Sequence, residues 1–178
     1  MKTPHGYDEI IAMFGDPENF DGTLNSVWEA KNIKSVAPPP GWQLYYQQKD
    51  GIVKVRTIRL HRLLEGSFQS VLRDIWNYVR SEIGSSATEA EIRQWLHERR
   101  LDIHGGGYNF REKRGNGTLS LHSYGIAIDW DPLHNPRKKP LTKTLPEWWY
   151  ELWQQHGWTD GREFPTPDPM HVQFATGA

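Results

Sequence analysis

Three consecutive glycines, Gly105–Gly107, separate two kinds of hydrophobic pattern in this chain of 178 residues. Before them, apolar residues recur every three or four positions from Leu60 to Val79, which predicts an amphipathic helix that ends at Gly84. After them, short apolar runs typical of strands continue to Trp130. Because helices come first and strands follow, we expect an α+β fold in which a small antiparallel sheet packs against helices.

Two T-x-x-E capping boxes predict further helices. Thr88 with Glu91 opens a helix before the glycines, and Thr144 with Glu147 opens a second one that Gly157 ends. A final strand is expected close to the C-terminal end of the sequence.

The first part of the chain, residues 1–59, is expected to form an extension packed on a core domain of residues 60–178. Its pattern predicts a short helix, then a Pro-rich wrap or linker, then a β-hairpin, over residues 7–14, 16–42 and 42–58. The hairpin follows from Asp50-Gly51, a favoured turn between two strand-like runs.

Composition excludes several classes of protein. There is no Cys, so thiolate catalysis and Cys-based metal sites are excluded, and any metal must be held by His, Asp or Glu. The formal net charge is -1, which favours no nucleic-acid partner. No stretch approaches the roughly 20 apolar residues of a membrane span. The first residues lack the apolar run of a signal peptide, so we expect synthesis in the cytoplasm. We also expect the protein to be a monomer.

Two His and two Asp residues are of the types that a hydrolytic zinc site uses. Such a site needs three protein ligands, an open position for water and a nearby carboxylate as base. His122, Asp129 and His171 could be the ligands and Asp168 the base. Because the first two are seven residues apart, a flat strand would point them to opposite faces, and a turn at Gly125 would be needed.

The spacing alone leaves other interpretations open. Asp168 and His171 flank Pro169, which predicts a turn, and turn-forming Asp and core His residues are both common without function. Two His with one carboxylate also occur in iron oxygenases, although with closer spacing. The stretch 131–139, with a His, an Asn and a basic cluster, allows a nuclease, but a surface loop is the simpler interpretation.

A family resemblance favours the zinc site. Residues 120–129, S-L-H-S-Y-G-I-A-I-D, meet every fixed position of the S-x-H-x-x-G-x-A-x-D signature. They resemble the zinc D-alanyl-D-alanine carboxypeptidases and L-alanyl-D-glutamate endopeptidases, a group that includes phage endolysins and vancomycin-resistance dipeptidases. Residues 168–171 resemble the acidic-x-x-His motif of that family, and residues 106–111 are similar to its Gly-Tyr-Arg region.

This resemblance extends over residues 60–174 and implies a function. It implies one zinc ion per chain, held by His122, Asp129 and His171, with Asp168 as general base. It further implies substrate binding by Arg111 and Ser120, with Arg111 also stabilising the oxyanion and with Arg114 as a competing candidate. The substrate would be a peptidoglycan stem peptide, cut by a D,D-carboxypeptidase or by an L-Ala-D-Glu endopeptidase of the endolysin or prophage type, acting on the cell wall after release.

A non-enzymatic interpretation also remains. A cell-wall-binding or phage structural module could keep the fold, and even the metal, without turnover. Asp168 distinguishes the two, because a module without catalysis has no need of a carboxylate three residues before the last ligand.

Overall fold

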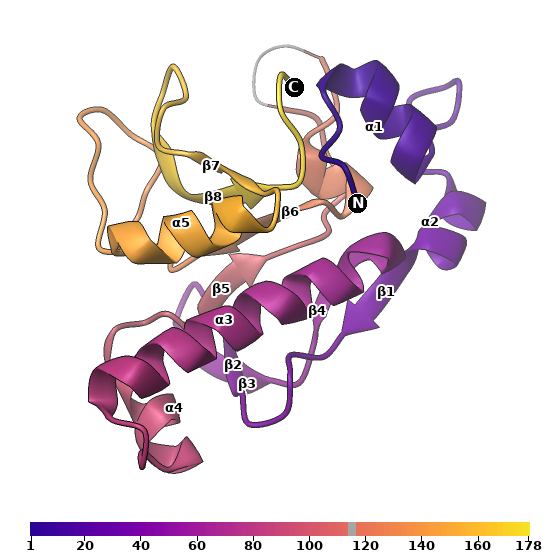
Figure 1. Ribbon diagram of the computed structural model, residues 1–178. Coiled ribbons are helices and arrows are strands. Elements are labelled where there is room, and N and C mark those ends of the chain that lie inside the picture. The colour runs from indigo at the N-terminus through magenta and orange to yellow at the C-terminus, as the bar shows by residue number, and fades with distance from the viewer. Residues whose placement is uncertain (114–116) are drawn as a thin grey trace.

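The computed structural model describes residues 1–113 and 117–178, and a six-stranded sheet runs through its centre (Figure 1). The strands lie in the order β3-β2-β5-β6-β8-β7. Their bounds are Leu44–Gln48 (β2), Gly51–Val55 (β3), Ile103–Gly106 (β5), Ala127–Trp130 (β6), Thr159–Gly161 (β7) and Asp168–Gln173 (β8). Neighbours are antiparallel, except that β2 and β5 are parallel. A two-stranded antiparallel sheet pairs β1 (Ile33–Val36) with β4 (Ile58–His61). The predicted α+β class is confirmed.

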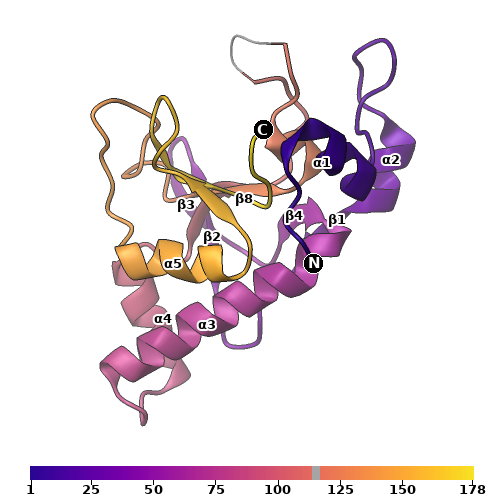
Figure 2. The same ribbon diagram turned by 45° about the horizontal axis from the view of Figure 1, so that its top comes forward.

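The structure also contains five α-helices and two short 3-10 helices within the described residues. They are Gly6–Phe14 (α1), Ser26–Asn32 (α2), Glu65–Ile83 (α3), Glu89–Glu98 (α4) and Glu147–Gln155 (α5), with short 3-10 helices at Arg62–Leu64 (η1) and Leu121–Tyr124 (η2). Helix α3 contacts both α4 and α5, whereas α1 and α2 lie at the opposite end of the molecule from α4 (Figures 1 and 2). Within the described residues, no helix is long and apolar enough to cross a membrane.

The apolar side of the helices packs on one face of the sheet. The predicted face of α3 is buried, including Phe68 and Ile75. From α5, the rings of Trp149 and Trp153 lie 6.0 and 5.8 Å from the ring of Trp130 in β6. Since side chains alternate along a strand, the residue before Trp130 points to the other face of the sheet, away from these helices.

The first 59 residues share the core of the later ones. Ile10, Phe14 and Leu44 are buried in the same apolar cluster as α3 and α5. The predicted hairpin is present as β2 and β3, and its first strand continues the main sheet by pairing with β5. The Tyr7 hydroxyl donates a hydrogen bond to the Leu119 carbonyl at 2.6 Å, so α1 is tied to the segment that precedes η2.

The prediction of an irregular wrap over residues 16–42 is wrong in part. Helix α2 and strand β1 form inside that range. The side chain of Asn25 accepts a hydrogen bond from the Trp28 amide and caps α2, and the Trp28 indole donates to the Phe14 carbonyl at 2.9 Å. The helix is therefore stabilised by contacts with α1 that a local pattern does not contain.

Two predicted helix starts also need correction. The long helix begins at Glu65 rather than near Leu60, because the residues before it pair with β1 as strand β4. The capping box at Thr88 is present. The one at Thr144 is absent: α5 follows Pro146 without a side-chain cap, and the Thr144 amide donates to the Asn135 side chain instead.

Gly125 makes the turn that the spacing of the motif requires. It has a φ of 68° and ends η2, and an added Cβ would lie 2.7 Å from the His61 amide nitrogen. Gly125→Ala is therefore expected to lower the free energy of unfolding by at least about 2 kcal/mol, measured by urea denaturation. Gly66→Ala in α3 is the control, since nothing lies within 4 Å of its added Cβ. Equal stability of the two variants would contradict this role for Gly125.

Candidate metal centre and its pocket

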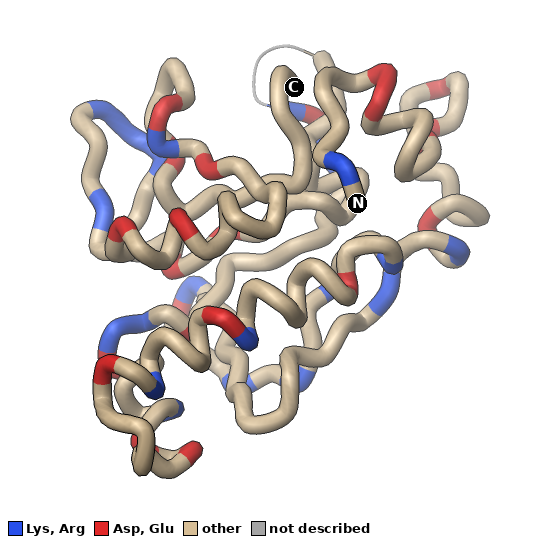
Figure 3. Tube along the Cα trace, in the orientation of Figure 1, with Lys and Arg blue, Asp and Glu red and all other residues tan. Residues whose placement is uncertain are grey.

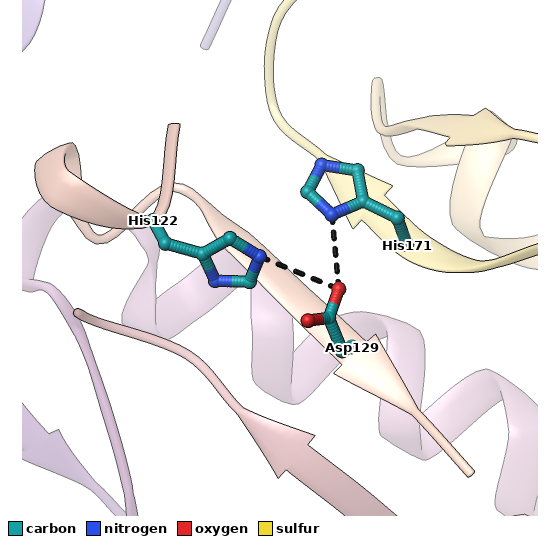
Figure 4. Close-up of side chains that lie close together, drawn as sticks. All are labelled: His122, Asp129 and His171. Atoms are coloured by element: carbon teal, nitrogen blue, oxygen red, sulfur yellow. Dashed lines mark hydrogen bonds and ion pairs between the residues drawn. The ribbon is translucent and has the colours of Figure 1, made fainter. Parts of the chain in front are cut away.

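Three side chains from separate elements meet on the face of the sheet that is opposite the helices. His122 lies in η2, Asp129 in β6 and His171 in β8, where the last two are direct partners across the antiparallel strands. Asp129 Oδ1 lies 2.9 Å from His171 Nδ1 and 3.3 Å from His122 Nε2 (Figure 4). One ligand atom of each residue lies within 4.8 Å of the others, so the group could hold a metal ion.

The backbone around Gly107 orients the first imidazole. His122 Nδ1 lies 2.6 Å from the Gly107 carbonyl oxygen. A carbonyl only accepts, so Nδ1 carries a proton and donates it, and in the neutral ring the lone pair is then on Nε2. That Nε2 is buried without a hydrogen-bond partner, and it faces Asp129. An unpartnered buried nitrogen is costly, and a metal ion would satisfy it, so the residues fit such an ion.

The charges of the three residues depend on one another. Burial by itself raises the pKa of Asp129, but His122 and His171 outweigh it and hold the pKa of this carboxyl well below its ordinary value. Burial by itself lowers the pKa of His171, but Asp129 and Asp168 outweigh it and raise that pKa. The carboxylate is thus ionised and ready to bind a cation, whereas His171 must release a proton when a metal binds.

Asp168 lies beside this group in a chemically different environment. Its Oδ1 is buried without a hydrogen-bond partner, and its Oδ2 lies 4.0 Å from Arg137 Nε. Burial raises the pKa of Asp168, and the nearby His171 only partly offsets this. A buried carboxylate with a free oxygen and a raised pKa has the properties of a general base.

The expected turn at residues 168–171 is not present, because these residues belong to strand β8. Two side chains three apart in a regular strand would face opposite sides. Here β8 is irregular: Asp160 pairs with Val172, but the next residue of β7, Gly161, pairs with Asp168. The extra residues of β8 reset the alternation, and Asp168 and His171 both line one pocket.

This pocket has a volume of about 480 Å³. It is lined by the three metal-capable residues and Asp168, by cationic and polar side chains, and by a few apolar ones. Beyond the four acidic and imidazole groups, the lining consists of Arg111, Lys113, Ser120, Leu121, Arg137, Phe164, Pro165, Thr166, Met170, Gln173 and Ala178. Among these described residues there is no Trp, and Trp42, Trp149 and Trp158 are buried in the core.

The predicted substrate residues lie at this pocket. The Arg111 amide donates to Ser123 Oγ at 2.8 Å, and the Ser123 hydroxyl lies 2.7 Å from the Arg111 carbonyl, so the backbone at Arg111 is fixed while its side chain stays exposed. Ser120 is buried, and its Oγ accepts from the His122 amide. The competing candidate, Arg114, lies outside the described residues.

Arg137 also lines the pocket, although no sequence motif predicts it there. It belongs to the basic run 137–139, in the connection between β6 and α5 (Figure 3), and only the position of that connection in space reveals its proximity to Asp168. The neighbouring candidates for a nuclease have structural partners instead. Asp131 is fully buried and accepts from Arg100 Nε at 2.7 Å, and His134 Nδ1 lies 3.1 Å from the same oxygen.

Comparison with known proteins agrees with this geometry. The family model of D-alanyl-D-alanine carboxypeptidase matches residues 114–174, which contain the metal-capable group and Asp168. No curated protein and no solved structure matches the chain. Over the matched residues the chain is similar to D-alanyl-D-alanine carboxypeptidases, and the match supports a zinc peptidase of that family.

Proposed function

We propose that this protein is a zinc-dependent peptidase that hydrolyses stem peptides of peptidoglycan. One observation carries the proposal: His122, whose buried Nε2 has no hydrogen-bond partner, and Asp168, whose buried Oδ1 has none either, line the same pocket. A metal site without catalysis would account for the nitrogen alone. The similarity over residues 114–174 supports the choice of peptidase over other metal hydrolases.

The three ligands would hold the metal ion, and the base would transfer the proton. A zinc ion held by His122, Asp129 and His171 would act as a Lewis acid and lower the pKa of water towards 7. Asp168 Oδ1 then accepts the proton of the attacking water and delivers it to the nitrogen of the leaving amine. Its burial suits the first of these transfers, because a raised pKa makes the carboxylate a better proton acceptor.

The cationic side chains of the pocket would bind the peptide. Arg111 has no ion-pair partner among the described residues, and it lines the pocket. We assign to Arg111 the binding of the substrate carbonyl or carboxylate. It would also stabilise the negative charge that develops when water attacks. Ser120 lines the same pocket.

The bond that is cut defines the finer function. A D,D-carboxypeptidase releases a single D-Ala, whereas an L-Ala-D-Glu endopeptidase of the endolysin type frees a new amino group on D-Glu. Purified peptidoglycan should be digested with the zinc-loaded protein, and the released fragments and new N-termini identified by mass spectrometry. We expect one zinc per chain by elemental analysis and cleavage at one of these two bonds. Stoichiometric zinc without cleavage would instead support a wall-binding or phage structural module.

A further inference from the structure

Gln173 lies directly behind the second imidazole of the candidate metal centre. It is two residues after His171 in β8, its side chain is almost fully buried, and its Oε1 lies 3.1 Å from His171 Nε2. The amide group of the same side chain reaches in the other direction, where Nε2 donates to the Ala175 carbonyl at 3.1 Å. Gln173 thus joins His171 to the backbone beyond the strand.

The hydrogen bonds determine which ring nitrogen of His171 carries the proton. The Ala175 carbonyl only accepts, so the NH₂ group of Gln173 must face it, and Oε1 must then face His171. Since Oε1 also only accepts, His171 Nε2 has to carry a proton and donate it. The other ring nitrogen, Nδ1, is the one that faces Asp129 Oδ1.

The two imidazoles therefore use opposite nitrogens. His122 is held with Nδ1 protonated by the Gly107 carbonyl, and Nε2 faces Asp129. His171 is held with Nε2 protonated by Gln173, and Nδ1 faces Asp129. In the neutral form of each ring, the acceptor on the far side leaves the lone pair on the nitrogen that faces Asp129 Oδ1, which is how ligands of a metal are commonly oriented.

We propose that Gln173 is a positioning residue that holds His171 in the Nε2-protonated form and so strengthens zinc binding. This rests on the proposed metal site but adds a role outside its three ligands. The Gln173 side chain also lines the pocket, so the role must be measured without substrate.

The central variant is Gln173→Met, which keeps the length of the side chain and removes the strong acceptor. The zinc dissociation constant, measured at fixed pH by competition with a chelator, is expected to rise by about 10- to 100-fold. Gln173→Glu restores an acceptor for His171 Nε2, and it should recover most of the lost affinity.

Thr159→Val is the matched control. The Thr159 hydroxyl donates to the same Ala175 carbonyl at 2.7 Å but does not touch His171. The loss of one hydrogen bond at that carbonyl is therefore common to both variants, and zinc affinity should stay at the wild-type value in Thr159→Val. Weakened binding in the control as large as in Gln173→Met would overturn the specific role.

A spectroscopic readout separates orientation from stability. In zinc-loaded protein with ¹⁵N-labelled His, long-range ¹H–¹⁵N spectra should show His171 protonated at Nε2, with a hydrogen-bonded proton that is lost or shifted in Gln173→Met and kept in Thr159→Val. Wild-type protein that binds no zinc would overturn the proposed function itself. Wild-type protein that binds zinc no more tightly than Gln173→Met, with an unchanged Nε2 signal, would overturn only the role of Gln173.

Discussion

Replacing Asp168 with Ala is expected to leave zinc bound and to slow peptidoglycan cleavage by about 10²- to 10⁴-fold, the usual contribution of general acid–base catalysis. Asp168 is not one of the three residues whose ligand atoms converge, so its loss leaves the metal-capable group complete. Its free Oδ1 is the proton acceptor that disappears. Elemental analysis for zinc and the rate of stem-peptide release should be measured on the same preparation.

Two further variants make this result specific. Asp168→Asn keeps the size of the side chain but removes its basicity, and it should lose as much activity as Asp168→Ala. Glu163→Ala removes an exposed carboxylate from the connection that precedes β8, and because Glu163 does not line the pocket this variant should keep its activity. Undiminished hydrolysis by Asp168→Ala would refute the assignment of the base.

The environment of Asp168 also predicts the acid side of the pH profile. Burial raises its pKa above the ordinary value of 3.8. A protonated carboxyl cannot accept a proton, so kcat/KM should fall as the pH falls through this raised pKa. The residual activity of Asp168→Ala should lack that limb, and a limb that persists in the variant would belong to another group.

Replacing either Asp129 or His171 with Ala is expected to remove stoichiometric zinc and to reduce hydrolysis to the background rate. Each change deletes one of three protein ligands, and the loss of affinity should exceed the roughly 10- to 100-fold that an outer-shell partner contributes. Zinc content after dialysis is the primary measurement. Near-ultraviolet circular dichroism, which reports on the buried Trp residues, should confirm that the fold is kept.

His134→Ala is the matched control for these ligand variants. His134 also forms an imidazole–carboxylate pair, with Nδ1 3.1 Å from Asp131 Oδ1, but it lies outside the metal-capable group. Zinc should therefore remain bound in this variant. Loss of zinc from His134→Ala, or its retention in Asp129→Ala, would show that the ligand set is wrong.

Local patterns predicted the elements whose stability is local. The buried face of α3 follows from its helical periodicity, and α4 begins at the Thr88 capping box. The turn at Gly125 follows from the odd spacing of His122 and Asp129, because backbone geometry in that short stretch leaves few alternatives. These features depend on residues only a few positions apart, so a single sequence contains their physical cause.

Other elements depend on distant partners. Helix α2 is held by contacts of Trp28 with α1, and β4 exists because β1 lies beside it. The capping box predicted at Thr144 does not form, because the side chain of Asn135 accepts a hydrogen bond from the Thr144 amide and donates one to the Thr144 hydroxyl. In each case a tertiary contact outweighs a local helix or capping preference, which is worth a few tenths of a kcal/mol to about 1 kcal/mol. A local sequence pattern contains no information about such a contact.

The sequence by itself determined which groups can do chemistry. Without Cys, metal binding is left to imidazoles and carboxylates, and two short motifs contain the His and Asp residues that the structure brings together. Only the tertiary structure decided that Asp129 and His171, 42 residues apart, lie opposite each other, that β8 is irregular enough for Asp168 to join them, and that Gln173 lies behind His171. The reason is physical: strand pairing is selected by non-local burial, here of Ile128 and Val172 on the helix-covered face, and the opposite face receives the site as a consequence.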